Sequence, residues 1–247
     1  LSKNMKSVFK LGQSPGDLMD IAINPKTNRA ALFSLPEDSC YHLFDCDSLS
    51  LLKRGGWFKQ HRNGVCSLNF DPEGLKIATL DWSGMLVLSD VNTGEFHAKV
   101  AAGTRDGTSW QTRNKCRWNP RQPLIAMSYD YSKLCMVDIE RQSIIDASGF
   151  DHSLKMSNIR WIDWHPDGNQ FVIASDDSLK IYDLREGRIP STVSTAHQDG
   201  IWSVRWSPCG NLLASSSEEV VVTDVRNSGQ VFKSDQDPAG SVNSVCF

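Results

Sequence analysis

The sequence of 247 residues lacks the features that mark several large classes of protein. Its seven cysteines form no Cys-x-x-Cys pair, and the first ten residues lack the apolar core of a signal peptide. No apolar run approaches the ~18 residues that a membrane-spanning helix needs. The balance of 26 basic against 29 acidic side chains gives no general field that would attract nucleic acid or anionic lipid. We therefore expect a cytosolic or nuclear protein with reduced, mostly buried cysteines and no membrane partner.

Motifs of catalysis and cofactor binding are also missing. The sequence contains no Gly-x-Ser-x-Gly, His-Glu-x-x-His, Gly-x-Gly-x-x-Gly or Gly-Lys-Ser/Thr, and its six histidines are dispersed. The acidic pairs Asp176-Asp177 and Glu218-Glu219 offer carboxylates in principle, but they fall in expected turns, where solvated polar residues are common. We expect no catalytic residue, no metal, no cofactor and no small-molecule substrate.

A helical apolar period is absent from the segments between the apolar runs, and short alternating runs take its place. The clearest stretch is His197 to Asp224. It holds alternating runs at 201–206 and 220–223 around a Pro-Cys-Gly turn and the segment 212–215. This arrangement predicts three short β-strands with no room for a helix.

The same pattern recurs along the chain. A tripeptide of an apolar or aromatic residue, any residue and proline is spaced at 47, 48, 46 and 42 residues, and each copy precedes a strand-like run that ends in aspartate. The linking segments leave room for a fourth strand, as at 95–100 and 229–233. A four-stranded sheet cannot cover both of its faces alone, so the units must stack. The prolines are Pro25, Pro72, Pro120, Pro166 and Pro208, and the closing aspartates are Asp45, Asp90, Asp138, Asp183 and Asp224.

This period, the aromatic-x-Pro turn, the Ala-Ser strand and the closing aspartate resemble the WD-repeat β-propeller family. The resemblance implies an all-β propeller of four-stranded antiparallel blades in a single domain spanning 1–247. The signature dipeptide departs from the family pattern, because no repeat ends in Trp-Asp. The expected repeats are approximately 12–52, 61–100, 108–147, 152–194 and 197–233, with a partial repeat at 238–247.

The two ends of the sequence carry single expected strands. SVNSVCF at 241–247 matches the start of the preceding repeat, and 8–11 reads as an outer strand that in this family completes the last blade. The resemblance implies a complete ring of seven blades, or alternatively six, of which these repeats are a part.

The family holds each blade with an aspartate in the turn between the second and third strands, which anchors a histidine ahead of the first strand. The resemblance implies this anchor in the fourth repeat, where Asp176 or Asp177 would pair with His152.

Serines stand at the expected position of that aspartate in the second and fifth repeats. Ser83 and Ser217 would leave His61 and His197 without an acid partner. We expect these two turns to be held by hydroxyl or backbone hydrogen bonds, in less rigid blades.

The resemblance also places a candidate binding surface at the mouth of the central channel. A large aromatic beside an arginine is typical of interface hot spots. Other loop aromatics either join this surface or hold their own loops, and the remaining tryptophans Trp118, Trp161, Trp164 and Trp206 are expected in the core. The mouth positions are Met19, Cys66, Asn114, Arg160, Trp202 and Asn243, and the loop aromatics are Trp82, Trp110, Tyr129 and Tyr131.

The predicted function is that of a non-catalytic scaffold that binds a peptide segment of a partner protein at this mouth, within a multi-subunit complex. Two alternatives stay open. Asp183-x-Arg185 and Asp224-x-Arg226 resemble the docking element of WD-repeat substrate receptors of cullin-RING ubiquitin ligases, although each arginine could simply pair with its own aspartate. Basic residues at 53–62 and 113–117 weakly suggest nucleic acid.

Overall fold

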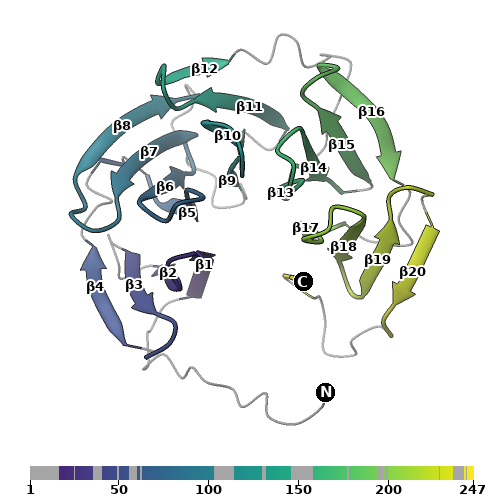
Figure 1. Ribbon diagram of the computed structural model, residues 1–247, viewed down its shortest axis with the longest axis horizontal. Helices are drawn as coiled ribbons and strands as arrows, with labels where there is room; N and C mark the ends of the chain where they lie inside the picture. The colour runs from purple at the N-terminus through teal and green to yellow at the C-terminus, as the bar shows by residue number, and fades with distance from the viewer. Residues whose placement is uncertain are drawn as a thin grey trace.

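Five four-stranded antiparallel sheets stand around a common axis in the computed structural model (Figure 1). The structure describes residues 17–24, 26–35, 41–48, 50–55, 60–61, 63–102, 114–129, 132–145, 158–176, 178–193, 197, 200–227, 229–235, 242 and 244–247. Within each sheet the strands pair in chain order, so each sheet is one propeller blade. The prediction of an all-β propeller of four-stranded blades is confirmed.

The blades follow one another along the chain, each running from an inner to an outer strand. Blade 1 holds β1 (Asp17–Asn24), β2 (Arg29–Leu35), β3 (Tyr41–Asp45) and β4 (Leu51–Gly55). Blade 2 holds β5 (Val65–Phe70), β6 (Lys76–Asp81), β7 (Met85–Asp90) and β8 (Phe96–Ala101). Blade 3 holds β9 (Cys116–Trp118), β10 (Leu124–Tyr129), β11 (Lys133–Asp138) and β12 (Ser143–Ile145). Blade 4 holds β13 (Trp161–Trp164), β14 (Gln170–Ala174), β15 (Leu179–Asp183) and β16 (Arg188–Val193). Blade 5 holds β17 (Ser203–Trp206), β18 (Leu212–Ser216), β19 (Val220–Asp224) and β20 (Gly229–Lys233).

The outer strand β20 coincides with the fourth strand expected at 229–233, and β8 lies one residue after the one expected at 95–100. The outer strand expected at 8–11 lies outside the described residues.

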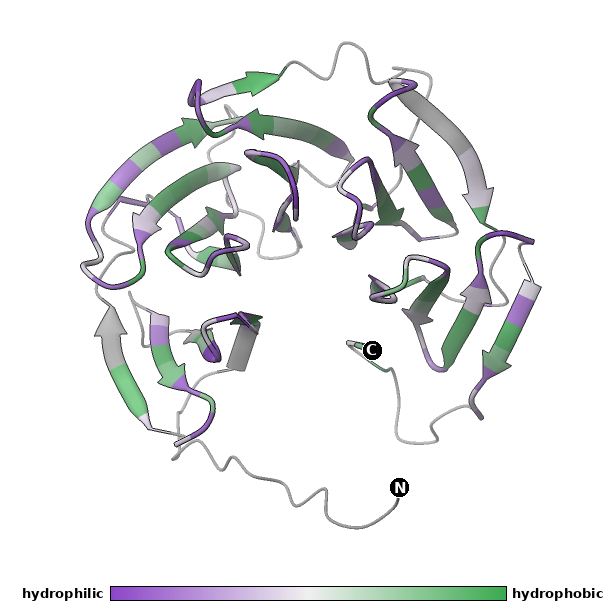
Figure 2. Ribbon diagram, in the orientation of Figure 1, coloured by the Kyte–Doolittle hydropathy of each residue, from purple (hydrophilic) through white to green (hydrophobic). Residues whose placement is uncertain are grey.

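Successive residues of one strand pack against different neighbouring blades. In β6, Ile77 joins the core shared with blade 1, while Ala78 joins the core shared with blade 3. In β10, Ile125 packs toward blade 2 and Ala126 toward blade 4. Side chains alternate between the two faces of a strand, and both faces of an inner blade are covered. The middle strands therefore consist of nearly unbroken apolar runs, and the hydrophilic residues gather at the turns (Figure 2).

The four tryptophans expected in the core are buried, as predicted. Trp118 Nε1 donates to the carbonyl oxygen of Asn69 at 3.2 Å, and Trp164 Nε1 donates to that of Arg117 at 2.9 Å. Each bond joins the inner strand of one blade to that of the preceding blade. These indoles therefore fill space and fix the register between blades.

The same register recurs at three of the places where inner strands meet. Asp20 accepts from the backbone N of Leu68 at 3.2 Å, and Ser67 accepts from that of Cys116 at 3.4 Å. Ser203 accepts from the backbone N of Val245 at 3.4 Å in the equivalent way. Residues 244–247 thus lie against blade 5 as an inner strand lies against the blade before it, next to β17 in Figure 1.

The proline turns connect the blades on the face where the inner strands end. Asn119 Nδ2 donates to the carbonyl oxygen of Gly168 at 2.8 Å, and Nε2 of His165 lies 3.1 Å from that of Gly210. Both glycines have φ near +75°, at 75° and 73°. A Cβ on Gly210 would lie 2.2 Å from Nε2 of His165. The turn therefore requires glycine for its backbone conformation and for the close approach of a side chain from the preceding blade.

Gly210→Ala is expected to lower the free energy of unfolding by about 2 kcal/mol, because it adds a steric clash to left-handed backbone strain. Gly187→Ala is the matched control. It has a similar φ of 63°, but its new Cβ would meet nothing closer than Tyr182 Oη at 4.0 Å. Urea unfolding measures both variants. Equal losses would show that the contact with His165 carries no energy.

Candidate functional site

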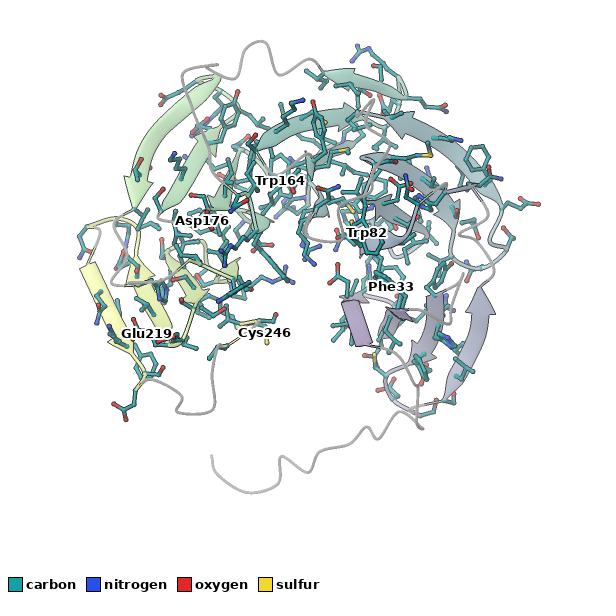
Figure 3. The ribbon with its side chains drawn as sticks, turned by 180° about the vertical axis from the view of Figure 1, so that it is seen from behind. Phe33, Trp82, Trp164, Asp176, Glu219 and Cys246 are labelled. Atoms are coloured by element: carbon teal, nitrogen blue, oxygen red, sulfur yellow. The ribbon has the colours of Figure 1, made fainter. Side chains whose placement is uncertain are left out.

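The loops that lead into the inner strands meet the turns between second and third strands on one face of the ring. Trp82 N donates to the carbonyl oxygen of Gly64, Trp202 N donates to that of Ser216, and Ser217 Oγ donates to that of Gly200. We call this surface the mouth face and define it by the described loop residues 60–61, 63–64, 81–84, 114–115, 129, 132–133, 158–160, 175–176, 178, 197, 200–202 and 216–220. Figure 3 labels Trp82 and Asp176 on two sides of the central axis.

Arg160 and Trp202 form a stacked pair on the mouth face. The guanidinium Cζ of Arg160 lies 4.1 Å from the centroid of the Trp202 ring. Its Nη2 lies 2.7 Å from Oδ1 of Asp176, whose Oδ2 accepts from Asn158 Nδ2 at 2.8 Å. A Cβ on Gly200 would lie 2.7 Å from the same Cζ. The guanidinium of Arg160 is therefore fixed by the Trp202 ring and the Asp176 carboxylate. It fits beside the backbone at position 200 because glycine has no side chain there.

This arrangement gives the stacked pair a defined chemistry. The ion pair with Asp176 balances the charge of Arg160, and the Trp202 ring is partly exposed. Cation–π stacking and the ion pair together restrict the rotamers of both side chains before any partner arrives. The pair thus offers apolar area with adjacent hydrogen-bonding groups.

Two other predicted mouth residues are covered by protein. Cys66 is buried and its Sγ lies 3.3 Å from the carbonyl oxygen of Leu80, while burial raises the pKa of its thiol well above the ordinary value. Asn114 is buried and donates from Nδ2 to the carbonyl oxygens of Asp81 and Trp82. Their prediction as partner contacts is corrected: Asn114 holds the turn at 81–82 from within, and Cys66 is packed in the core of blade 2.

The two described loop aromatics, Trp82 and Tyr129, also pack against the protein itself. A Cβ on Gly64 would lie 2.7 Å from the Trp82 ring, so this indole covers the backbone of its own blade. Tyr129 packs at the edge of the core between blades 2 and 3, with Lys133 Nζ 5.8 Å from its ring centroid. Met19 belongs to β1, but its side chain is outside the described residues, as are Trp110, Tyr131 and Asn243.

Comparison with known proteins agrees with this architecture. The family described as the anaphase-promoting complex subunit 4 WD40 domain matches residues 116–208. The angio-associated migratory cell protein of Homo sapiens is 23% identical over 92% of this chain and 53% of its own length. The transcriptional corepressor LEUNIG_HOMOLOG of Arabidopsis thaliana is 20% identical over 76% of this chain and 23% of its own length. The chain is similar in sequence to WD-repeat proteins, and its fold is a β-propeller of four-stranded blades like theirs.

The chain spans about half the length of the first of these relatives and less of the second. The WD-repeat propeller is generally a non-catalytic scaffold for protein interactions. In the described residues no group of three or more His, Cys, Asp or Glu side chains could hold a metal ion. No helix in this part of the chain is long and apolar enough to cross a membrane.

The histidine anchor of blade 2 corrects the prediction that His61 lacks an acid partner. Its Nδ1 lies 3.1 Å from Oδ2 of Asp81, and its Nε2 lies 2.8 Å from Oγ1 of Thr79. Oδ1 of Asp81 accepts from the backbone N of Ser83 at 2.9 Å and of Met85 at 3.0 Å. The anchor is two residues earlier than expected, at the end of β6.

The electrostatics of this anchor favour a charged carboxylate. Burial works to raise the pKa of Asp81, but hydrogen bonds from His61, Ser83 and the Met85 backbone together outweigh it and place the pKa below the ordinary value. The carboxylate is fully covered, so it has to be satisfied by these donors alone.

Blade 5 uses a glutamate in place of the missing aspartate. His197 Nε2 lies 2.8 Å from Oγ of Ser215, and its Nδ1 lies 3.7 Å from Oε1 of Glu219. The carboxylate of Glu219 is closer to Lys233 Nζ, at 2.8 Å. His197 therefore has an acid neighbour, contrary to the prediction, but Nδ1 forms no hydrogen bond. The hydroxyl bonds expected in this turn are present, since Ser217 Oγ donates to the Gly200 carbonyl oxygen at 3.1 Å.

The acid predicted in the fourth repeat has two partners among the described residues. Asp176 contacts Arg160 and Asn158, as described above. His152 and Asp177 lie outside the described residues.

The aspartates that close the third strands have a structural role that does not need a preceding tryptophan. Asp90 Oδ1 accepts from the backbone N of Asn92 at 2.8 Å and of Thr93 at 2.7 Å. Asp138 accepts from the backbone N of Arg141 in the same way. The aspartate therefore satisfies turn donors that have no strand partner.

The two Asp-x-Arg elements are self-paired. Arg185 donates from Nε and Nη2 to the two carboxylate oxygens of Asp183, at 3.1 and 2.6 Å, and Arg226 binds Asp224 likewise at 3.0 and 2.6 Å. These hydrogen bonds lower the pKa of Asp183 and bring that of Asp224 to about 2. The geometry matches the simpler of the two interpretations, in which each arginine pairs with its own aspartate.

A charged cluster on the inner strands was not predicted as a site. Lys115 and Arg117, part of the basic segment 113–117, are buried rather than presented to nucleic acid. They meet Asp20, Asp163 and Arg205 around the ring of Trp161. Each residue of this cluster follows a predicted mouth position by one or three residues. The same repeat alignment, read at those two positions, could have identified the cluster from the sequence.

Proposed function

We propose that this WD-repeat propeller binds a peptide segment of another protein on its mouth face, with the stacked pair of Arg160 and Trp202 as the central contact. The observation that carries the proposal is the preorganised ring of Trp202, partly exposed and held by Arg160. Side chains that are already ordered lose little conformational entropy when a partner binds. Tryptophan and arginine are also the residues that most often dominate binding energy.

A peptide is the partner that fits this surface best. The pair combines a flat apolar ring with a guanidinium and the Asp176 carboxylate within one contact region. An extended peptide can place an apolar side chain on the ring while its backbone amides reach the polar groups. The family match to a subunit of the anaphase-promoting complex supports the further proposal that the chain works within a multi-subunit assembly.

The proposed compartment is the cytosol or nucleus. The cysteines in the described residues, Cys46, Cys66, Cys116, Cys135, Cys209 and Cys246, are all free thiols, which supports a reducing environment. No observation favours the ubiquitin-ligase or nucleic-acid alternatives over the scaffold, and neither is proposed.

Trp202→Ala is expected to weaken binding of peptides selected on the wild-type propeller about 30-fold, the usual loss at a hot spot. A synthetic array of 15-residue peptides selects the binders, and fluorescence anisotropy measures their dissociation constants. Phe232→Ala is the matched control, because this aromatic is 52% exposed and lies on the outer strand β20, whereas Trp202 directly precedes the inner strand β17. A folded Trp202→Ala variant that keeps wild-type affinity would refute the proposal.

A further inference from the structure

Three cations surround one buried tryptophan on the inner strands of blades 3, 4 and 5. Lys115 Nζ lies 4.6 Å from the Trp161 ring centroid, Arg117 Cζ lies 4.9 Å from it, and Arg205 Cζ lies 5.2 Å from it. Lys115 and Arg117 are 7% and 4% exposed. Cations repel one another and lose hydration when buried, so such a group needs compensation.

Two carboxylates compensate only part of this charge. Asp20 Oδ2 lies 3.3 Å from Lys115 Nζ, and Asp163 Oδ1 lies 3.0 Å from Arg205 Nη1. Within the described residues Arg117 has no ion-pair partner, and its Nη1 donates to the Cys116 carbonyl oxygen at 2.9 Å. With three cations against two carboxylates, the cluster keeps one positive charge.

The cluster also contains two buried donors without acceptors. Arg117 Nε and Trp161 Nε1 are both covered, and neither forms a hydrogen bond in the described structure. Burial, followed by repulsion from Arg205, lowers the pKa of Arg117, as expected for a guanidinium with too little compensation. A water molecule could accept from these donors, but it could not balance the charge.

We propose that the Arg117, Trp161 and Arg205 side chains form a binding site for a small oxyanion of the size of phosphate or sulfate. Such an ion supplies the missing negative charge and several acceptor oxygens in one compact group. The low exposure of Arg117 favours a free ion over a peptide chain. Arg205 and Asp163, at 28% and 15% side-chain exposure, form the accessible side of the cluster. The site is independent of the proposed peptide contact.

The test is a titration of the purified protein with inorganic phosphate at constant ionic strength, with chloride as the replaced ion. Calorimetry is expected to show saturable binding. At a phosphate concentration of about 100 times the dissociation constant, the folding equilibrium constant is expected to rise about 100-fold. A response to phosphate no larger than that to chloride would overturn the proposal.

Two variants locate the ion. Arg117→Gln is expected to lose at least about tenfold in phosphate affinity, since a charge-assisted hydrogen bond is removed. Lys133→Gln, which removes an exposed cation beside Tyr129, is the control and keeps wild-type affinity. Trp161→Phe keeps the aromatic ring and removes only the Nε1 donor, so it tests the site if Arg117→Gln does not fold. Wild-type affinity in either folded variant would contradict the assignment.

Discussion

Asp20→Asn is expected to lower the free energy of unfolding by about 3 kcal/mol. The Asp20 carboxylate joins three blades, because it accepts from Ser67 Oγ at 2.9 Å and Leu68 N at 3.2 Å and lies 3.3 Å from Lys115 Nζ. The substitution keeps the size of the side chain but leaves a buried ammonium group without its counter-charge. Removal of one partner from a buried ion pair commonly costs ~3–5 kcal/mol.

A double-mutant cycle separates the charge from the packing. Lys115→Met alone leaves the Asp20 carboxylate without its ammonium partner, whereas Asp20→Asn combined with Lys115→Met removes both charges of this ion pair. The double variant is therefore expected to be more stable than Asp20→Asn alone. Urea unfolding of all four proteins gives the coupling energy. Additive losses in the cycle would show that the two charges do not stabilise each other.

The acid dependence of stability provides a second measurement. Burial works to raise the pKa of Asp20, but Lys115, Arg117 and the hydrogen bonds outweigh it and place the pKa below the ordinary value of 3.8. A lowered pKa in the folded state stabilises the protein above the unfolded pKa, and this stabilisation is lost as the pH falls toward the folded pKa. The wild type should therefore lose stability below about pH 4 more steeply than Asp20→Asn.

Asp81→Ala is expected to lower the free energy of unfolding by about 3 kcal/mol, because it leaves buried donors of His61, Ser83 and Met85 without an acceptor. Asp90→Ala is the matched control. Its carboxylate also accepts from two backbone N–H groups, but those donors are exposed and water can replace the acceptor, so a loss of about 1 kcal/mol is expected.

Thermal and urea unfolding compare these two variants, and amide hydrogen exchange at Met85 reports the local effect. Faster exchange at Met85 in Asp81→Ala, with an unchanged rate at Asn92, would place the damage in the anchor of blade 2. Equal losses of stability in the two variants would contradict a special role for the buried anchor.

The blade pattern could be predicted because each of its signals is local. Alternation in Ile201 to Trp206 indicates a strand, and a proline turn ends it within a few residues. The outer strands β8 and β20 were expected for the same reason. The site could be predicted only in part, since the mouth position of Cys66 follows from the repeat but its burial does not.

In the histidine anchors, a shift of two residues in the position of the acid was enough to make the motif-based prediction wrong. The repeat alignment places Ser83 at the expected acid position, while the pairing acid, Asp81, closes the preceding strand. Turn geometry sets which of these side chains faces His61, and a spacing rule does not contain that geometry. In blade 5 the acid nearest to His197 is Glu219, two residues after Ser217, at 3.7 Å and without a hydrogen bond to Nδ1.

The sequence by itself determined that the chain forms four-stranded blades, how many repeats it holds and which tryptophans are buried, because these follow from periodicities of a few residues. Only the tertiary structure decided that Arg160 stacks on Trp202 and that Asp20 reaches Lys115. These residues come from different blades, and no local pattern links them. Their contact depends on the angle between neighbouring blades around the common axis. The packing of whole sheets sets that angle.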